Sequence, residues 1–285
     1  MKIILSRKGF DSSCGCVASP ILPGGTLLSL PIPSPSSPIS YGDICCGGHS
    51  LGSIVEDLTR GRVTREDSAH LDPDLLACAY PRQAGWRALF GQAGAAQSHL
   101  ARAQVTEGDL FLFFGWFRQS EFVDGRYQYV PGAPDLHVIY GWLQIDTVLH
   151  LPQDQLCVPQ WAAYHPHLHG TFPDNNTLYV ARESLRLSEK ERGYAGSGIF
   201  ERYRDSLCLT APGNTRSIWR LPEWFCPKNG SLPLSYHSDP KRWTSGNGHT
   251  ILRSAQRGQE FVLDADQYPA AVAWAHRLVT DTGHR

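Results

Sequence analysis

The apolar positions of this chain form long unbroken runs in the middle and shorter, periodic patterns toward both ends. Residues 109–118 (DLFLFFGWFR) and 136–149 (LHVIYGWLQIDTVL) are mostly apolar and aromatic, which is typical of strands buried on both faces. Between them, Asp124-Gly125 is a dipeptide that favours a hairpin turn. The pattern predicts two long neighbouring strands at the centre of a sheet.

Helical spacing and further strand-like runs surround this centre. Apolar side chains recur at i, i+3, i+4 and i+7 in residues 51–62, which predicts an amphipathic helix. Residues 93–103 and 268–279 are further helix candidates, and the proline-rich segment 31–40 predicts a loop. Additional strands are predicted at residues 2–5, 176–182, 207–210 and 258–264.

Strands thus dominate the middle of the chain, and helices lie at its edges. This arrangement predicts an α+β fold. We expect a single compact unit, residues 1–285, built around a curved, mostly antiparallel sheet with peripheral helices.

Composition narrows the class of protein only slightly. The formal net charge of −1 argues against a strongly basic nucleic-acid binder but leaves room for a local basic patch. The N-terminal apolar run ends after "IIL" and no later stretch reaches the length of a membrane span. We therefore expect a soluble, cytoplasmic protein with no membrane partner, whose eight cysteines are free thiols.

The densest group of reactive side chains follows the first predicted strand, in SRKGFDSSCGC. Arg7 offers a planar fork suited to a carboxylate, a phosphate or a base edge. Cys14 or Cys16 is a candidate thiolate because cationic side chains lie close in sequence. An ordinary turn explains Asp11 and its neighbours equally well.

Two sets of residues are candidate zinc ligands. Cys14, Cys16, Cys46 and His49 form the first set, although C-x-C and C-C are not the usual C-x₂-C spacing. In YHPHLHG, three histidines share one face if the segment is extended. A solvated loop is the alternative for this second set, which consists of His165, His167 and His169.

Other polar residues could belong to an active site or merely to the scaffold. His70, Asp72 and Asp74 in AHLDPDLL form either a helix cap and turn or an acid–base and positioning group. Amide side chains such as Gln92 and Gln97 can read base edges. The polar group before the last predicted strand is either a structural ion pair or a second wall of the site, and it consists of Arg257, Gln259 and Glu260.

The chain resembles the nucleotide modification associated domain proteins of the third type. The resemblance is carried by MKIILSRKGFDSS, SPILPGGTLLSLPIP, HLDPDL, FGQAGAAQSHL, GDLFLFFGWFR, HVIYGWLQI and RGQEFVLD, which span nearly the full length. It implies a role in modifying bases of bacterial or phage DNA. Its implied partners are DNA that carries a modified base and other proteins of a DNA-modification gene cluster. The cysteines of SSCGC and ICCGGH depart from the family pattern.

A second resemblance covers residues 90–150, which look like the core segment of PUA-like readers of modified bases, such as EVE domains. It implies a pocket between two aromatic strands that can stack a flipped base. The candidate walls are Trp116, Phe117, Tyr140 and Trp142.

Two functions of different classes follow. The first is an enzyme that tailors a modified base in DNA, for example by hydrating the nitrile of a 7-deazaguanine base to an amide. A thiolate or a metal-bound hydroxide could attack the nitrile carbon. The second is a reader that binds a modified base without chemistry.

These arguments give three sets of expected site residues. The residues expected to take part in catalysis are Arg7, Asp11, Cys14, Cys16, Cys46, His99 and Glu260. The residues expected to bind the base are Gln92, Gln97, Trp116, Tyr140, Trp142, Arg257 and Gln259. The residues expected to converge on one cleft are Arg7, Asp11, Gln97, His99 and Glu260.

Overall fold

Two long antiparallel strands form the centre of the molecule. We analysed a computed structural model that describes residues 1–187, 193–228 and 230–281. Strands β6 (Leu110–Val123) and β8 (Leu136–His150) pair with each other, as the apolar runs predicted. The phenylalanines of β6 between positions 111 and 117 are fully buried. Each buried phenylalanine side chain contributes roughly 1.5–3 kcal/mol relative to an exposed one.

The remaining strands of the main sheet lie on both sides of this pair. Strand β1 (Lys2–Arg7) is parallel to β6 and antiparallel to β14 (Glu260–Asp264). On the other side, β9 (Thr177–Ala181) pairs with β8, and β5 (Leu89–Gln92) pairs with β9. The order is therefore β14-β1-β6-β8-β9-β5, a path with two open ends within the described residues. It confirms the predicted, mostly antiparallel sheet and shows no closed barrel there.

Three short strands extend the ends of β6 and β8. Strand β2 (Ser19–Ile21) is parallel to β6, and β10 (Ser197–Ile199) is antiparallel to β8. Strand β7 (Arg126–Tyr129) returns along β6 as the second arm of a hairpin. The turn residues Asp124 and Gly125 have φ values of 51° and 78°, and positive φ at both central positions is what a type I′ hairpin turn requires.

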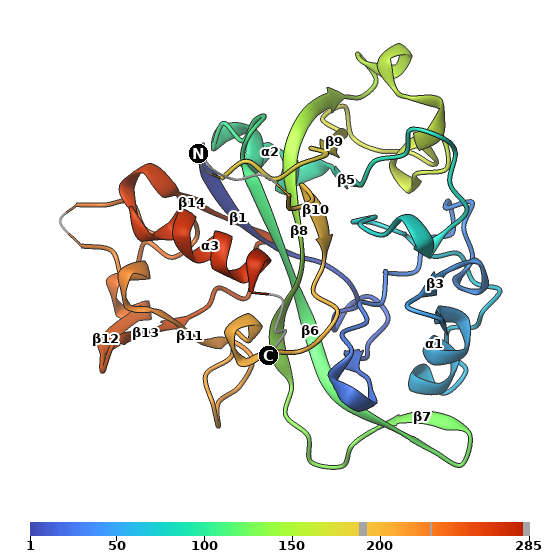
Figure 1. Cartoon of the computed structure of the whole chain (residues 1–285), viewed down its shortest axis with the longest axis horizontal. Helices are drawn as coiled ribbons and strands as arrows, with labels where there is room; N and C mark the ends of the chain where they lie inside the picture. The colour runs from blue at the N-terminus through green and yellow to red at the C-terminus, as the bar shows by residue number, and fades with distance from the viewer. Residues whose placement is uncertain (188–192, 229, 282–285) are drawn as a thin grey trace.

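The three α-helices among the described residues lie at the periphery of the sheet, as the sequence predicted (Figure 1). They are α1 (Leu51–Thr59), α2 (Gly94–Arg102) and α3 (Ala270–Thr280). None of the described helices is long and apolar enough to span a membrane. The predicted strand at 207–210 was wrong in its extent, because Cys208 and Thr210 form isolated bridges after a short 3₁₀ turn.

Two small sheets flank the main one. A three-stranded sheet has the order β11-β13-β12, formed by β11 (Ile218–Pro222), β13 (His249–Arg253) and β12 (Trp243–Gly246). It lies on the same side of the main sheet as β14 and α3 (Figure 1). On the other side, β3 (Cys45–Cys46) and β4 (His49–Ser50) form a short ladder before α1.

Candidate active site

A cavity of about 690 Å³ lies beside the ends of β1 and β5, where segments far apart in the sequence meet. The loop that follows β1, residues 7–14, forms part of its lining, and Gly91 and Gln92 of β5 form another part. The loops around residues 215–217 and 254–259 complete it. Small-molecule sites in proteins have volumes of roughly 300–1,000 Å³, so this space can hold a nucleotide.

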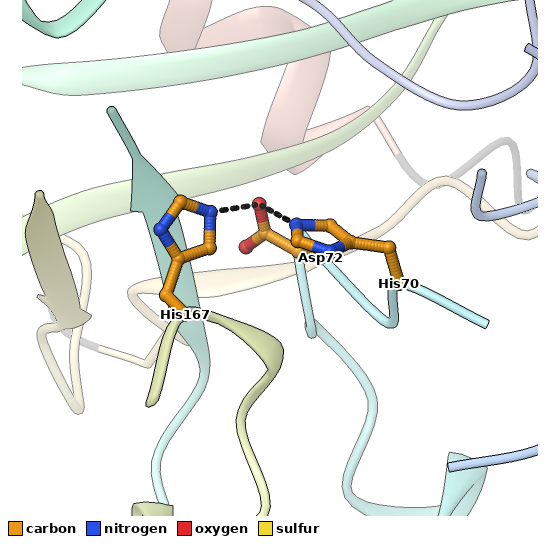
Figure 2. Close-up of side chains that lie close together, drawn as sticks. All are labelled: His70, Asp72 and His167. Carbon is orange, nitrogen blue, oxygen red and sulfur yellow. Dashed lines mark ion pairs between the residues drawn. The ribbon is translucent and has the colours of Figure 1, made fainter. Parts of the chain in front are cut away.

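Asp72 is buried in the wall of this cavity and is faced by three imidazole rings. Its Oδ1 accepts a 2.7 Å hydrogen bond from the backbone N–H of Gly91 and lies 3.3 Å from Nε2 of His165. Its Oδ2 lies 3.8 Å from Nε2 of His70 and 3.8 Å from Nε2 of His167. Figure 2 shows these last two rings flanking the carboxylate.

The segment that carries His70 and Asp72 is held against β5 by backbone hydrogen bonds. The N–H of Asp74 donates to Leu89 O and the N–H of Leu89 donates to Asp74 O, at 2.8 and 3.0 Å. The N–H of His70 donates to Ile32 O at 2.8 Å. The main chain therefore fixes where the Asp72 carboxylate lies.

The other two histidines near Asp72 are His165 and His167. They lie at a 3₁₀ turn, Pro166–Leu168, and not in the extended segment that we expected. His165 begins this turn, and its Nδ1 accepts a hydrogen bond from the N–H of His167. The turn brings both rings toward Asp72. The third histidine of the motif, His169, instead donates from Nε2 to the carbonyl of Ala163 at 2.8 Å.

Gly91 allows the His167 ring to lie directly on the backbone of β5. A Cβ at position 91 would be only 2.2 Å from Cδ2 of His167, far inside van der Waals contact. The ring is also anchored on its other side, because Nδ1 of His167 lies 2.6 Å from Oδ1 of Asn176. Since that oxygen can only accept, Nδ1 carries the proton and Nε2 presents a lone pair toward Asp72.

Burial and mutual contacts together set the protonation states of Asp72 and the histidines around it. Burial alone would raise the pKa of Asp72, but the hydrogen bond from His165 and the surrounding imidazoles lower it to about 2. Burial lowers the pKa of His70 and lowers the pKa of His167 to about 4. At neutral pH the carboxylate is therefore ionised and these two rings are neutral, which is the state that metal binding requires.

His70, Asp72 and His167 form a group that can hold a metal ion, since their ligand atoms all lie within 4.8 Å of one another. Two ligands bound tetrahedrally at about 2.1 Å are about 3.4 Å apart, so the observed 3.8 Å needs only a small contraction. Two imidazoles and one carboxylate also leave coordination positions open for water or substrate.

Cationic and aromatic side chains line the same cavity. Nη2 of Arg7 donates to the carbonyls of Gly258 and Gln256, at 2.8 and 3.3 Å, and burial lowers the pKa of Arg7. The Arg216 guanidinium lies 4.1 Å from the centre of the Trp116 ring. Nη1 of Arg216 is buried and has no hydrogen-bond partner among the described residues, so it is available to an anionic ligand.

Residues 2–264 match the model of a family described as nucleotide modification associated domain 3. The chain belongs to this family. The match runs from β1 to the end of β14 and so includes every segment that lines the cavity. The family name associates these proteins with the modification of nucleotides. A search of curated proteins and a search of solved structures each found no match.

A second buried carboxylate, Glu260, lies directly behind the cavity wall of this family member. Its Oε1 accepts hydrogen bonds from Gln92 Nε2 at 2.6 Å and Ser6 Oγ at 3.1 Å. Nζ of Lys8 lies 2.9 Å from the same oxygen and 4.6 Å from the centre of the Phe90 ring. The Gln92 amide is engaged through its Nε2 in this network and accepts at Oε1 from the N–H of Ala93.

Several residues expected in the site do line the cavity, and others lie elsewhere. The lining residues among them are Arg7, Asp11, Cys14, Gln92, Trp116, His167 and Gln259. Gln97 and His99 of α2 do not line it: Gln97 accepts a hydrogen bond from Tyr179, and His99 bonds to Ser235. Of the five residues expected to share one cleft, the structure thus brings Arg7 and Asp11 together, with Glu260 behind them.

Of the four aromatic residues expected to form walls of the site, only some line the cavity. Trp116 lines the cavity and donates from Nε1 to Asp135 at 2.9 Å. Tyr140 lines a separate small hollow, and Trp142 packs against Phe200 with ring centres 4.9 Å apart. The fourth candidate, Phe117, is fully buried in the core.

The cysteine residues do not gather into one ligand group with His49. Cys14 lines the cavity, Cys16 is exposed, and Cys46 lines the hollow that contains Tyr140. Burial raises the pKa of Cys14, and the nearby Asp11 raises it further. Burial raises the pKa of Cys46 to about 12. Neither thiol is therefore prepared as a thiolate at neutral pH.

Sequence reasoning assigned the three residues of this candidate metal group to different interpretations. His70 and Asp72 were candidates for an acid–base pair, and His167 was a candidate ligand in a histidine-only set. The spacing that joins them, His-x-Asp followed by a histidine 95 residues later (167 minus 72), is not one of the short ligand spacings that predict a metal site. Arg216 was not expected, because a single arginine in a loop carries no motif.

Proposed function

We propose that the chain is an enzyme that tailors a modified base in DNA, with the base bound in the cavity beside Asp72. The observation that carries this proposal is the group of His70, Asp72 and His167, which points ligand atoms at one spot in the wall of a nucleotide-sized cavity. Other proteins of a DNA-modification gene cluster would install the base on which it acts.

We further propose that this group binds zinc or a similar divalent ion. Nε2 of each ring and an oxygen of Asp72 would be the ligands, and His165 would hold the other carboxylate oxygen. A bound divalent ion lowers the pKa of a water ligand to near neutrality and so supplies a nucleophile. The chain's own contribution is to exclude bulk water, to keep Asp72 ionised and to fix the His167 tautomer through Asn176.

The remaining lining residues suit a nucleotide. Arg7 and Arg216 can bind phosphate oxygens through charge-assisted hydrogen bonds, and the exposed part of the Trp116 ring can stack on a base. Gln259 offers an amide of the kind that reads donor and acceptor groups on a base edge. These roles account for a cavity that contains both cations and a carboxylate group.

The reaction that fits best is the addition of water to an exocyclic group, such as the nitrile of a 7-deazaguanine base. The oxygen of water bonds to the nitrile carbon as one C–N π bond breaks, and a proton of that water moves to nitrogen to give an imidic acid. Tautomerisation then moves the hydroxyl proton to nitrogen, which replaces the remaining C=N π bond by a C=O bond and leaves an NH₂ group. The product is an amide that is heavier by one molecule of water. Nothing is oxidised or reduced, so no redox partner is needed.

A thiol route has less support. The pKa values of Cys14 and Cys46 are both raised by burial, whereas a nucleophilic cysteine needs a lowered pKa. Cys16 is exposed and outside the cavity lining. The metal-activated water is therefore the preferred nucleophile.

The test is nucleoside analysis by mass spectrometry of DNA from cells with the wild-type gene, without it, or with Gly91→Ala. A methyl group at position 91 displaces the His167 ring, so Gly91→Ala should give the same nucleosides as the strain without the gene. Gly246→Ala is the matched control, because a Cβ there meets nothing within 4 Å. Identical nucleosides in all four strains, with the precursor base present, would contradict the proposal.

A reader of modified bases is the second candidate, and the Arg216–Trp116 pair favours it. A cation stacked on an aromatic ring at a cavity can hold a base without any chemistry. In that case wild type and Gly91→Ala would bind DNA with the modified base equally, and the nucleoside composition would not depend on the gene.

A further inference from the structure

A second hollow, of about 500 Å³, adjoins the cavity on the side of the small three-stranded sheet. The two spaces share four lining residues, Ser217, Ser254, Ala255 and Gln256. We call the second hollow the arginine groove, because its lining also contains Arg242, Arg253 and Arg257. Its lining includes Ile218 of β11 and Arg253 of β13, and these strands lie on the side of the main sheet where β14 and α3 are found (Figure 1).

The loop between the cavity and the arginine groove is firmly held. Its carbonyls at Gln256 and Gly258 accept hydrogen bonds from Arg7, which lines the cavity. On the groove side, the N–H of Ala255 donates to Nε2 of His237 at 2.9 Å. A ligand that spans both spaces therefore meets a fixed ridge, and its parts on the two sides keep a defined spacing.

The arginine groove carries cationic charge that the protein does not neutralise. Arg253 and Arg257 are exposed, and neither forms an ion pair with a carboxylate within the described part of the chain. Arg242 donates from Nη1 to the backbone carbonyl of Arg253 at 3.0 Å, which leaves its charge uncompensated. Three unpaired guanidinium groups in one hollow favour a ligand with several anionic groups.

An exposed aromatic side chain completes the arginine groove. Tyr236 is 45% exposed, and its ring rests on His99 with ring centres 4.6 Å apart. Its φ of 67° is uncommon for a tyrosine. The ring also packs over Gly258, where an added Cβ would lie 3.2 Å from Cε2 of Tyr236. A cationic groove with a fixed aromatic surface is the arrangement that binds single-stranded nucleic acid.

We infer that the arginine groove holds the single strand of DNA that flanks the nucleotide in the cavity. Arg242, Arg253 and Arg257 bind phosphates of the neighbouring nucleotides, and Tyr236 stacks on one neighbouring base. This inference rests on the proposed function, since it takes the cavity as the place of the reacting base. It makes the substrate a base within a strand, rather than a free nucleotide.

The test is a fluorescence binding titration with unmodified single-stranded DNA of about 12 nucleotides, alongside a titration with a deoxynucleoside monophosphate. Arg253→Ala/Arg257→Ala should weaken binding of the strand roughly tenfold at about 0.1 M salt. The slope of log K against log salt should fall by about 1.4, or 0.7 for each lost phosphate contact. Affinity for the monophosphate should not change.

Two further variants separate this inference from the proposed function. Arg216→Ala removes a cation from the cavity and should weaken binding of the monophosphate as well as binding of the strand. Arg126→Ala, an exposed residue of β7, is the matched control and should change neither. We expect Arg253→Ala/Arg257→Ala to weaken binding of the strand without changing binding of the monophosphate, and we expect no other variant to show this pattern.

Other outcomes would overturn the inference. If the groove variant binds the strand with wild-type affinity and salt slope, the arginine groove is not the strand site, while the proposed function stands. If wild type prefers duplex DNA or an RNA of the same sequence, single-stranded DNA is the wrong occupant. If wild type binds neither the strand nor the monophosphate, the proposed function fails together with the inference.

Discussion

Asp72 and Glu260 are two buried carboxylates that bond to adjacent residues of the same strand, Gly91 and Gln92 of β5, yet their surroundings differ. Asp72 bonds to the N–H of Gly91 and Glu260 bonds to the side chain of Gln92. The remaining neighbours of Glu260 are a lysine at 2.9 Å and a serine hydroxyl. The remaining neighbours of Asp72 are imidazole rings.

The difference shows how a buried charge can be either structural or functional. Glu260 forms an ion pair with Lys8, so its charge has a partner within the protein itself. The rings of His70 and His167 are neutral at pH 7, so neither of these two rings balances the charge of the Asp72 carboxylate. A charge that the fold leaves incomplete in a cavity wall is a candidate for ligand binding.

The largest expected effect is the loss of metal binding in Asp72→Asn. Asparagine keeps the size of the side chain and can still accept from Gly91, but it removes the negative charge. We expect zinc affinity to fall by at least about 100-fold, measured by competition with a chromogenic chelator. If Asp72→Asn binds zinc as tightly as wild type, the group of His70, Asp72 and His167 is not the metal site.

Glu260→Gln should instead reduce stability. It leaves Lys8 buried without a counter-charge, and breaking such a pair costs about 3–5 kcal/mol. We expect the free energy of unfolding in urea to fall by about that amount, while zinc affinity stays within about threefold of wild type.

The double variant Lys8→Met/Glu260→Gln is the control for this second prediction. Removing both charges should restore much of the lost stability, because the uncompensated lysine is gone. A Glu260→Gln protein of normal stability that no longer binds zinc would abolish the distinction between the two carboxylates.

The sequence predicted the central strands well because the local run of apolar residues is itself enough to indicate that they are buried. In β6 and β8, aromatic and apolar residues occupy both faces, so the pattern does not depend on the register or on the partner strand. The turn at Asp124-Gly125 was equally local, since its two residues provide the positive φ values themselves.

The sequence predicted the site less completely because the site depends on long-range pairing. Asp72 meets His167 only because residues 70–74 and the turn after Pro166 both pack against β5. Gly91 gives no signal in the sequence, although a side chain there would exclude the His167 ring. The histidine motif stood out in the sequence, but its conformation decides which of its rings lie near the carboxylate.

A third prediction concerns acid stability and uses His137, a buried histidine that lines the cavity. Burial lowers the pKa of His137 from 6.5 to about 3, and its Nδ1 accepts from Trp219 Nε1 at 3.0 Å. The folded state therefore binds fewer protons than the unfolded state between these values. This contribution to stability is complete above about pH 6.5 and is lost as the pH falls toward 3.

The measurement is urea unfolding of the metal-free protein from pH 7 to pH 4. His137→Gln should flatten the loss of stability by about 1.4 kcal/mol per pH unit below pH 6.5. His150→Gln is the control, because His150 is exposed. Equal slopes for wild type and His137→Gln would show that His137 does not remain neutral in the folded protein.

The smallest expected effect is that of Cys14→Ser, which tests whether the cavity thiol takes part in the chemistry at all. Cys14 lines the cavity, but burial and the nearby Asp11 raise its pKa, and a thiol that stays protonated is a poor nucleophile. If the nucleophile is a water held beside Asp72, the rate of product formation should stay within about twofold of wild type, whereas loss of a covalent nucleophile would cost about 100-fold or more. Nucleoside mass analysis after incubation with DNA that carries the modified base measures this rate. Cys16→Ser is the matched control, because that thiol is exposed and outside the cavity lining. A protein that loses its activity with Cys14→Ser, but keeps its zinc, would make the thiol the reacting group and leave the metal a supporting role.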